Sequence, residues 1–208
     1  MSIYIVAFTG ASGAPYGIRL ITELLKRGDD IELLISPSGF LILKEELGLD
    51  LLKDNVEKGL LAYLKSASKK AALKGRLNYT PSNDIGARLA SGGAFGAVKA
   101  MIICPCSMGT LGRVAGGISG NLIERAADCV LKENRPLVLV PRETPFNAIH
   151  LENMLRLSRA GAVILPAMPA FYTKPVTVDD MVDFVVGKAL DVLKVEHSLY
   201  KRWKSEEN

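Results

Sequence analysis

Five short apolar runs recur along the chain, and small or turn-forming residues follow each of them. The runs span residues 3–8, 31–35, 101–104, 137–140 and 162–165. Because they are continuous and do not alternate with polar residues, they predict strands that are covered on both faces, as in a parallel sheet. Parallel strands need crossover connections, so helices are expected between the runs.

Helical patterns fill the intervals between these runs. Apolar residues recur at helical spacing over residues 18–25 and stop at Gly28, and a second series over residues 122–131 stops before Pro136. A last helix is predicted over about residues 178–195. Strands that alternate with helices imply right-handed crossovers. We therefore expect a doubly wound, three-layer α/β domain with a mainly parallel sheet, of the flavodoxin-like or Rossmann-like kind.

No linker divides the 208 residues, so a single domain over residues 1–208 is expected, with residues 196–208 as a C-terminal tail. Residues 49–74 are rich in Lys and Leu and have the character of a helical insertion. Residues 79–96 read as a long irregular segment, which is uncommon unless it is functional.

The charge balance and the cysteines limit the function classes. Twenty-six basic and 22 acidic side chains give a net charge of +4, too small and too scattered to indicate nucleic-acid binding, although it would help to gather small anionic ligands. No window approaches ~18 uninterrupted apolar residues, so a membrane span is not expected. Three cysteines, and an N-terminus without a signal-peptide pattern, predict reduced thiols and a cytoplasmic location.

Ligands of doubly wound sheets bind beyond the carboxyl ends of the strands, so the residues after each run are the candidates. The first run leads into Gly10, Ala11 and Ser12 ahead of a predicted helix. Glycine lets the backbone approach a ligand closely, and the N–H groups that open a helix face an anion. The spacing matches neither the dinucleotide fingerprint nor the P-loop, which favours a mononucleotide. A tight turn without a ligand is the alternative.

Three later strand ends carry polar groups. Ser36 could hydrogen-bond a flavin or a phosphate, but for this residue alone a helix cap is the favoured interpretation. Ser107 and Thr110 offer hydroxyls beside backbone amides. Arg142 suits an anionic phosphate and Glu143 suits proton transfer, and such a charged pair between two prolines is costly to bury without a task.

The remaining candidates have structural alternatives. Cys104 and Cys106 lack a second Cys/His pair, so no metal is expected, and buried thiols are commoner at a strand end than catalytic ones. A solvated basic face is the favoured interpretation of Arg125 and Lys132, which share one side of a helix. Tyr172 could donate to a phosphate or pack as an aromatic plug. Trp203 could wall a site in this or a neighbouring subunit, or anchor the tail.

The ordered succession of these motifs resembles the flavin prenyltransferases, the UbiX-like family once described as aromatic-acid decarboxylases. The likeness runs from Ile5 to about Trp203, through Thr-Gly-Ala-Ser-Gly-Ala, Cys-Pro-Cys-Ser, Asn-Leu-Ile-Glu-Arg-Ala-Ala-Asp, Leu-Lys-Glu and Pro-Leu-Val-Leu-Val-Pro-Arg-Glu-Thr-Pro. It implies a metal-independent transferase that joins a dimethylallyl group from dimethylallyl monophosphate to N5 and C6 of reduced FMN. The product would serve a separate UbiD-like decarboxylase, and the enzyme would assemble from trimers into a homododecamer.

The resemblance also implies the roles of individual residues. FMN would be held by Gly10, Ala11, Ser12, Ser36, Ser107, Met108, Gly109, Thr110 and Arg142. The allylic phosphate would face Arg125, Lys132, Tyr172 and Lys188. Catalysis would fall to Glu46, Glu143 and Lys132. The adjacent Glu45 leaves the register of Glu46 open by one residue.

Two positions depart from the family pattern, and two rival functions share the fold. Lys188 stands where Arg is common, which keeps the charge but loses the bidentate fork, and Ile85 stands where some members have Trp. Whether the donor is a monophosphate or a diphosphate therefore stays open. The rivals are a flavin-dependent cysteine decarboxylase and an FMN-binding module. The decarboxylases carry a catalytic His and a Pro-Ala-Ser-Ala-Asn-Thr-like motif, whereas this chain has Cys-Pro-Cys-Ser there and only His150 and His197.

Overall fold

The computed structural model describes residues 2–53, 55–67 and 72–202. Within these residues six parallel strands form one sheet in the order β3-β2-β1-β4-β5-β6. Their bounds are Ile3–Phe8 (β1), Asp30–Ile35 (β2), Leu77–Pro81 (β3), Val98–Cys106 (β4), Leu137–Pro141 (β5) and Val163–Ile164 (β6). This is the strand order of doubly wound nucleotide-binding sheets of the Rossmann kind, so the predicted fold class is confirmed.

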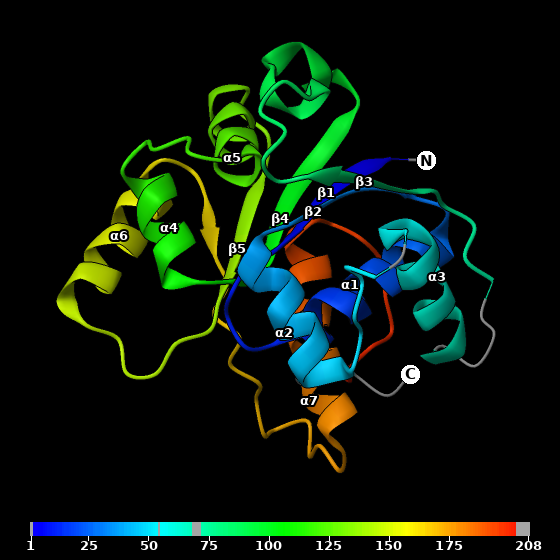
Figure 1. The fold of residues 1–208 in the computed structure, drawn as a ribbon. Coiled ribbons are helices and arrows are strands. Elements are labelled where there is room, and N and C mark those ends of the chain that lie inside the picture. The colour runs from blue at the N-terminus through cyan, green and yellow to red at the C-terminus, as the bar shows by residue number, and fades with distance from the viewer. Residues whose placement is uncertain (1, 54, 68–71, 203–208) are drawn as a thin grey trace.

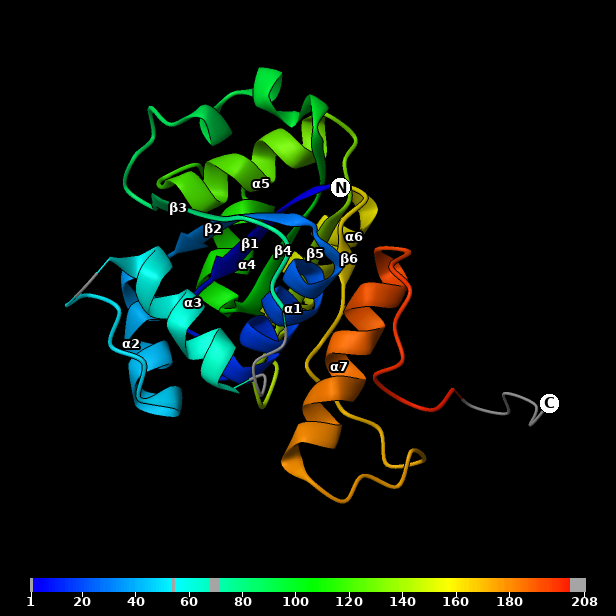
Figure 2. The same cartoon turned by 90° about the vertical axis from the view of Figure 1, so that its right-hand side faces the viewer.

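Helices cover both faces of the sheet, and Figures 1 and 2 show the three layers. One face carries α1 (Ala14–Arg27), α2 (Pro37–Leu47), α3 (Val56–Ala67) and α7 (Val178–Val192), and the other carries α4 (Met108–Ala115), α5 (Leu122–Lys132) and α6 (Ala148–Arg159). Two short 3₁₀ turns, Arg88–Ala90 and Gly92–Gly96, lie beside α5. No helix among the described residues is long and apolar enough to span a bilayer.

The central strand explains why the apolar runs are continuous. Tyr4, Val6 and Phe8 of β1 are buried in the cluster under α1 and α7, while Ile5 and Ala7 are buried in the cluster under α4 and α5. Every second residue therefore packs against a different helical layer, and both series must be apolar.

Helix boundaries follow local signals. α1 ends at Gly28, which adopts a left-handed conformation (φ 92°) and donates its N–H to the carbonyls of Leu24 and Leu25. α5 starts at Asn121, whose side chain accepts from the N–H of Glu124. α7 starts with a reciprocal cap between Thr177 and Asp180, and ends three residues before the predicted limit.

The main difference from the sequence-based expectation is strand β3. It pairs with β2 from Ile31↔Leu77 to Ile35↔Pro81, partly within the segment that was expected to be irregular. As an edge strand it buries only Leu77, so it lacks the apolar run that identifies the central strands. The predicted insertion contains α3, and the predicted third strand extends from Val98 through both cysteines.

Candidate functional site

The strand order reverses between β1 and β4, because the chain adds β2 and β3 on one side of β1 and β4 to β6 on the other. Hydrogen bonds join the loops at the carboxyl ends of β1 and β4. Thr9 Oγ1 accepts a hydrogen bond from the N–H of Ser107 (2.7 Å) and donates to the carbonyl of Pro105 (2.9 Å). Ligands of doubly wound sheets bind at such a switch point. The sequence-predicted residues that follow β1, β2, β4 and β5 all lie at this edge.

The loop after β1 packs tightly against α2. A Cβ added to Gly10 would lie 2.6 Å from the Cβ of Ser38, so only glycine fits there. Ala11 is buried and Ser12 is exposed. Gly13 begins α1 without a side-chain cap, and its positive φ (120°) turns the chain into the helix.

Glu46 provides the anion that this helix end requires. Its carboxylate accepts from the N–H of Gly13 (3.0 Å) and from the N–H of Ala14 (2.8 Å). The N–H groups at the start of α1 therefore donate to a carboxylate from α2, which shows that this helix N-terminus binds an anionic group. It is Glu46, not the neighbouring Glu45, whose carboxylate reaches this loop.

Hydroxyl groups follow β2 and β4. Ser36 caps α2, with Oγ accepting from the N–H of Gly39 (3.0 Å), so the capping interpretation is confirmed while its hydroxyl proton stays available to a ligand. Ser107 caps α4 in the same way, accepting from the N–H of Thr110 (3.3 Å). Between Ser107 and Thr110, the Met108 side chain packs into the core and Gly109 is exposed. A ligand could therefore contact the backbone of these two residues.

The end of β5 adds a cation and a carboxylate. Arg142 is exposed and donates from Nε to the carbonyl of Ser12 (3.4 Å), which brings the guanidinium to the loop after β1. The Glu143 carboxylate is half-buried and accepts from the N–H of Thr144 (3.1 Å). Consecutive residues at this carboxyl edge of the sheet thus supply a positive and a negative side chain.

The cysteines at this edge are not reactive groups. Cys104 and Cys106 are fully buried, and burial raises the pKa of both thiols, that of Cys106 to about 12. Neither presents a thiolate at neutral pH. Among the described residues no cluster of His, Cys, Asp or Glu could hold a metal ion.

The four residues expected at the allylic phosphate lie on opposite faces of the sheet. Arg125 and Lys132 belong to α5, where Arg125 donates to the carbonyl of Ala90 (2.9 Å) and pairs with Asp128 (2.6 Å). Tyr172 and Lys188 lie at α7 on the other face (Figure 2). Within one chain these two pairs do not meet.

Tyr172 and Lys188 share an aromatic support. The ring of Tyr172 stands edge-on to Phe184 at 5.7 Å, and the Nζ of Lys188 lies 5.9 Å from the Phe184 ring and 5.6 Å from the Tyr200 ring. Asp191 anchors the segment that carries Tyr200 by accepting from Tyr200 Oη and His197 Nε2. Trp203 lies outside the described residues.

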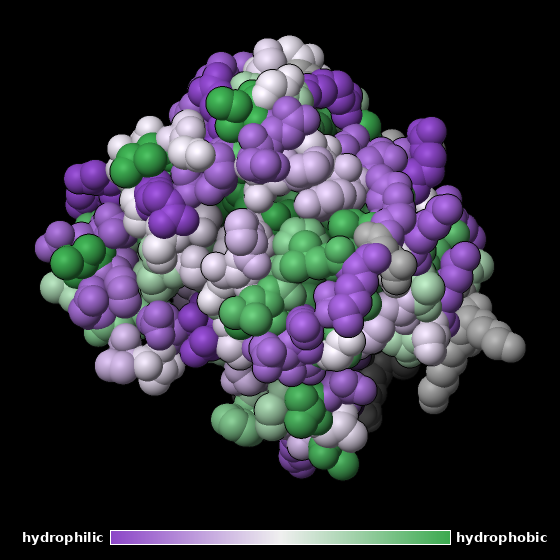
Figure 3. Space-filling view, viewed as in Figure 1, coloured by the Kyte–Doolittle hydropathy of each residue, from purple (hydrophilic) through white to green (hydrophobic). Residues whose placement is uncertain are grey.

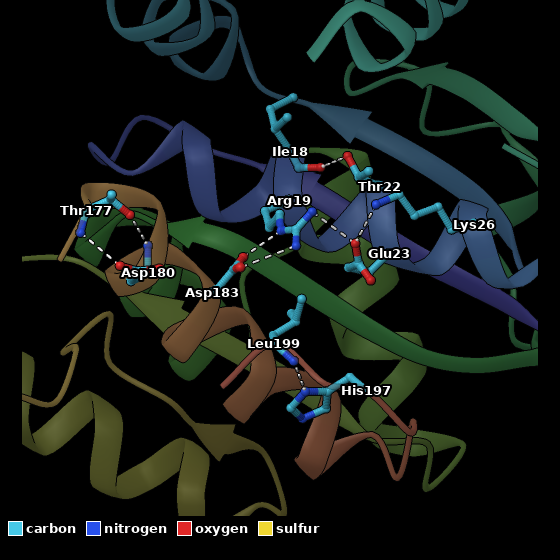
Figure 4. Close-up of polar contacts among 10 residues, drawn as sticks. All are labelled: Ile18, Arg19, Thr22, Glu23, Lys26, Thr177, Asp180, Asp183, His197 and Leu199. Carbon is cyan, nitrogen blue, oxygen red and sulfur yellow. Dashed lines mark hydrogen bonds and ion pairs between the residues drawn. The ribbon is translucent and has the colours of Figure 1, made fainter. Parts of the chain in front are cut away.

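A cavity of about 410 Å³ lies between α1, α3 and α7. Its polar side is Arg19, which donates from Nε and Nη2 to Asp183 at 2.6 and 3.3 Å (Figure 4). None of the predicted site residues lines it.

Sequence reasoning missed an ion pair, Arg113–Glu124, whose arginine contacts a predicted site residue. The buried carboxylate of Glu124 accepts from Arg113, and Arg113 in turn donates to Thr110 Oγ1 (3.4 Å). Asn121 followed three residues later by Glu124 is a visible capping pattern, but the partnership with Arg113 across two helices is not.

Comparison with known proteins decides the family. The flavoprotein family model matches residues 2–190. A protein named flavin prenyltransferase UbiX from Halalkalibacterium halodurans is 51% identical over 204 residues, covering 98% of this chain and 94% of its own. One of the same name from Pseudomonas aeruginosa is 48% identical over 95% of this chain and 92% of its own. The chain belongs to the UbiX flavin prenyltransferase family.

Solved UbiX structures have the same fold. AnUbiX (PadA1), described in complex with FMN and dimethylallyl pyrophosphate, superimposes with a TM-score of 0.82 at 36% identity and 99% coverage of both chains. A dodecameric FMN-dependent UbiX-like decarboxylase from Escherichia coli O157:H7 gives 0.81 at 38% identity, covering 98% of this chain and all of that one. The FMN-dependent cysteine decarboxylase TvaF gives 0.55 at 15% identity over 79% of this chain and 89% of its own, which shows a shared fold alone.

Proposed function

We propose that this UbiX-family chain transfers a dimethylallyl group from dimethylallyl monophosphate to N5 and C6 of reduced FMN. The observation that carries the proposal is the convergence of the loops after β1, β2, β4 and β5 on one switch point, in a chain about half identical to named flavin prenyltransferases. The product would be the prenylated FMN that a separate UbiD-like decarboxylase uses. We place the enzyme in the cytoplasm, as one domain.

FMN fits the groups at this edge. A phosphate that displaced the Glu46 carboxylate from the amides that open α1 would gain the helix dipole, and Arg142 stands beside the same loop as a cation. Gly10, Ala11 and Ser12 would let the backbone approach it closely. Ser36, together with the segment from Ser107 to Thr110, would donate hydrogen bonds to flavin oxygens and nitrogens.

The chain's carboxylates would handle the protons of ring closure, because forming the bond at C6 adds a proton to the other carbon of the dimethylallyl double bond and removes one from C6. Glu143 follows the end of β5 next to Arg142, and its carboxylate accepts a hydrogen bond from the N–H of Thr144. Glu46 lies in α2, and its carboxylate contacts the loop that would hold the flavin. Either carboxylate could act as the proton acceptor. Arg, Lys and Tyr donors would stabilise the phosphate as its charge grows.

The donor site would be completed between copies of the chain. Arg125 and Lys132 of one copy would meet Tyr172 and Lys188 of another, because within a single chain the sheet separates the two pairs. An exposed apolar segment supports this arrangement. Before and at the start of α7 the chain exposes Met168, Phe171, Val176 and Val178. Figure 3 shows apolar surface at the lower end of the view, where this segment lies.

Exposed apolar surface of this kind marks protein contacts, and a related UbiX-like protein is dodecameric. We therefore propose that trimers of this chain, assembled into a dodecamer, share their donor sites.

The direct test is anaerobic incubation of the purified protein with reduced FMN and dimethylallyl monophosphate, followed by mass spectrometry of the released flavin. A covalent dimethylallyl adduct that requires the protein supports the proposal, and a parallel reaction with the diphosphate settles which donor is used. Tight FMN binding without adduct would indicate a binding module. Carbon dioxide released from a cysteine substrate would indicate a decarboxylase.

A further inference from the structure

We propose that Arg113 and Glu124 are a positioning pair for the flavin site. They hold the Ser107–Thr110 hydroxyl couple so that one hydroxyl proton remains for an acceptor atom of FMN. This inference rests on the proposed function, because it presumes that FMN binds at the loop after β4. Neither residue is among those that the family resemblance assigns.

Glu124 is a buried and fully engaged carboxylate. Only 1% of the residue is exposed. Its Oε2 accepts from the N–H of Gly120 (2.8 Å), while Oε1 accepts from Asn121 Nδ2 (2.9 Å) and from Arg113 Nε. A buried charge is tolerated when it is paired and hydrogen-bonded, so Glu124 is a fixed anchor for the cation that it binds.

Arg113 lies on α4 and points back to the first turn of that helix. Its Nε donates to Glu124, its Nη2 donates to Thr110 Oγ1 (3.4 Å), and its Nη1 would lie 3.4 Å from a Cβ placed on Gly109. The side chain is 46% exposed, so without Glu124 it could swing into solvent. Because the guanidinium is planar and rigid, the ion pair between Nε and Glu124 also sets the direction in which Nη1 and Nη2 point.

The hydrogen-bond inventory around the couple leaves one proton unused. Ser107 Oγ accepts from the N–H of Thr110 and donates to Thr110 Oγ1 (3.1 Å). Thr110 Oγ1 also accepts from Arg113, which has donors only. Both neighbours of the couple therefore donate, and in this arrangement the hydroxyl proton of Thr110 is left over. The ligand atom that meets it must be an acceptor, such as a carbonyl or phosphate oxygen.

The same pair connects the two halves of the proposed site. Glu124 precedes Arg125 in α5, whereas Thr110 lies in the first turn of α4. Arg113 therefore links the start of α4, where we place FMN, to α5, the helix that carries Arg125 and Lys132.

A purely structural role is the competing explanation, since Glu124 also holds the backbone of Gly120 and the side chain of Asn121 at the start of α5. The test uses Arg113→Gln, whose half-exposed side chain can be replaced without opening the core, and measures FMN affinity by quenching of flavin fluorescence in the absence of any donor. We expect the dissociation constant for FMN to rise roughly 3–10-fold, the scale of one net hydrogen bond, and the melting temperature of the FMN-free protein to fall, because the buried Glu124 carboxylate loses its ion-pair partner. Arg156→Gln is the matched control, because Arg156 also donates to α4, from Nη1 to the carbonyl of Ala115, but far from the couple.

A double-mutant comparison decides whether Arg113 acts through the hydroxyl. Thr110→Val combined with Arg113→Gln should bind FMN no more weakly than Thr110→Val alone, whereas Thr110→Ser should keep the dependence on Arg113. Additive losses, or an Arg113→Gln affinity equal to that of the unmodified chain, would overturn the inference. If the unmodified chain itself bound no FMN, the proposed function would fail as well, so the two failures are distinguishable.

Discussion

Glu46 Oε2 accepts the backbone N–H of Ala14 at 2.8 Å, which places a carboxylate from α2 at the start of α1. This contact joins the loop that follows β1 to the helix that follows β2. Replacing Glu46 with alanine should lower the free energy of unfolding by ~0.3–1 kcal/mol, the usual worth of an anion at a helix N-terminus. Urea unfolding of the FMN-free protein measures it. The neighbouring exposed Glu45→Ala should change little, and equal losses in both variants would refute the assigned register.

Glu143→Gln should separate binding from chemistry. The substitution removes a proton acceptor but keeps the shape of a side chain that accepts a hydrogen bond from the N–H of Thr144. We expect unchanged FMN affinity and adduct formation slowed by ~10²–10⁴-fold, the usual scale for general acid–base catalysis. Single-turnover mass spectrometry measures the rate. A rate equal to that of the unmodified chain would remove Glu143 from the mechanism.

Arg142→Ala should weaken flavin retention. Arg142 is exposed and donates a long hydrogen bond to the carbonyl of Ser12, so its loss should leave the fold intact. The loss of a charged hydrogen bond to the phosphate predicts FMN affinity lower by roughly 10–100-fold. Riboflavin, which has no phosphate, provides the control: its affinity should be nearly unaffected. Equal weakening of both ligands would place Arg142 away from the phosphate.

Asp191 should make the end of α7 acid-sensitive. Burial alone would raise the pKa of its carboxyl, but hydrogen bonds from Tyr200, Arg202 and His197 outweigh burial and lower it. A carboxyl whose pKa is lowered by folding stabilises the protein above its unfolded pKa, about 3.9, and this contribution is lost as the pH falls through the folded value.

The variant Asp191→Asn should therefore be less stable than the unmodified chain at pH 7, and the two stabilities should converge below about pH 4. Urea midpoints measured across this range give the comparison, with the exposed Glu152→Gln as control. Because Tyr200 lies under Lys188, Asp191→Asn should also raise the KM for dimethylallyl monophosphate. Parallel pH profiles for the two chains would contradict this role of Asp191.

The central part of the fold is predictable from sequence because its signals are local. Continuous apolar runs identify the buried strands, and Gly28 ends α1 as expected. The edge strand β3 and helix α6 lack such signals. β3 buries only Leu77, and α6 buries only Leu157, so neither shows a full apolar stripe.

The site is predictable only in part, for a physical reason. Residues that directly follow strands, such as Ser107 and Arg142, are brought together by topology alone. Contacts between side chains of different elements depend on packing, which the sequence pattern does not contain. The Arg113–Glu124 pair is one example. The placement of Lys132 and Lys188 on opposite faces is another, because spacing tells which residues share a helix face but not which layer that helix joins.

Because Lys132 and Lys188 lie on opposite faces of the sheet, the proposed donor site must be built from two copies of the chain, and one experiment tests this directly. Lys132→Met and Lys188→Met should each retain FMN but form almost no adduct. Co-expressed with different affinity tags and purified through both, they should regain activity, about a quarter of that of the unmodified protein if the copies mix at random, because some sites then receive both lysines. Mixed oligomers that contain both variants and still make no adduct would contradict a shared site.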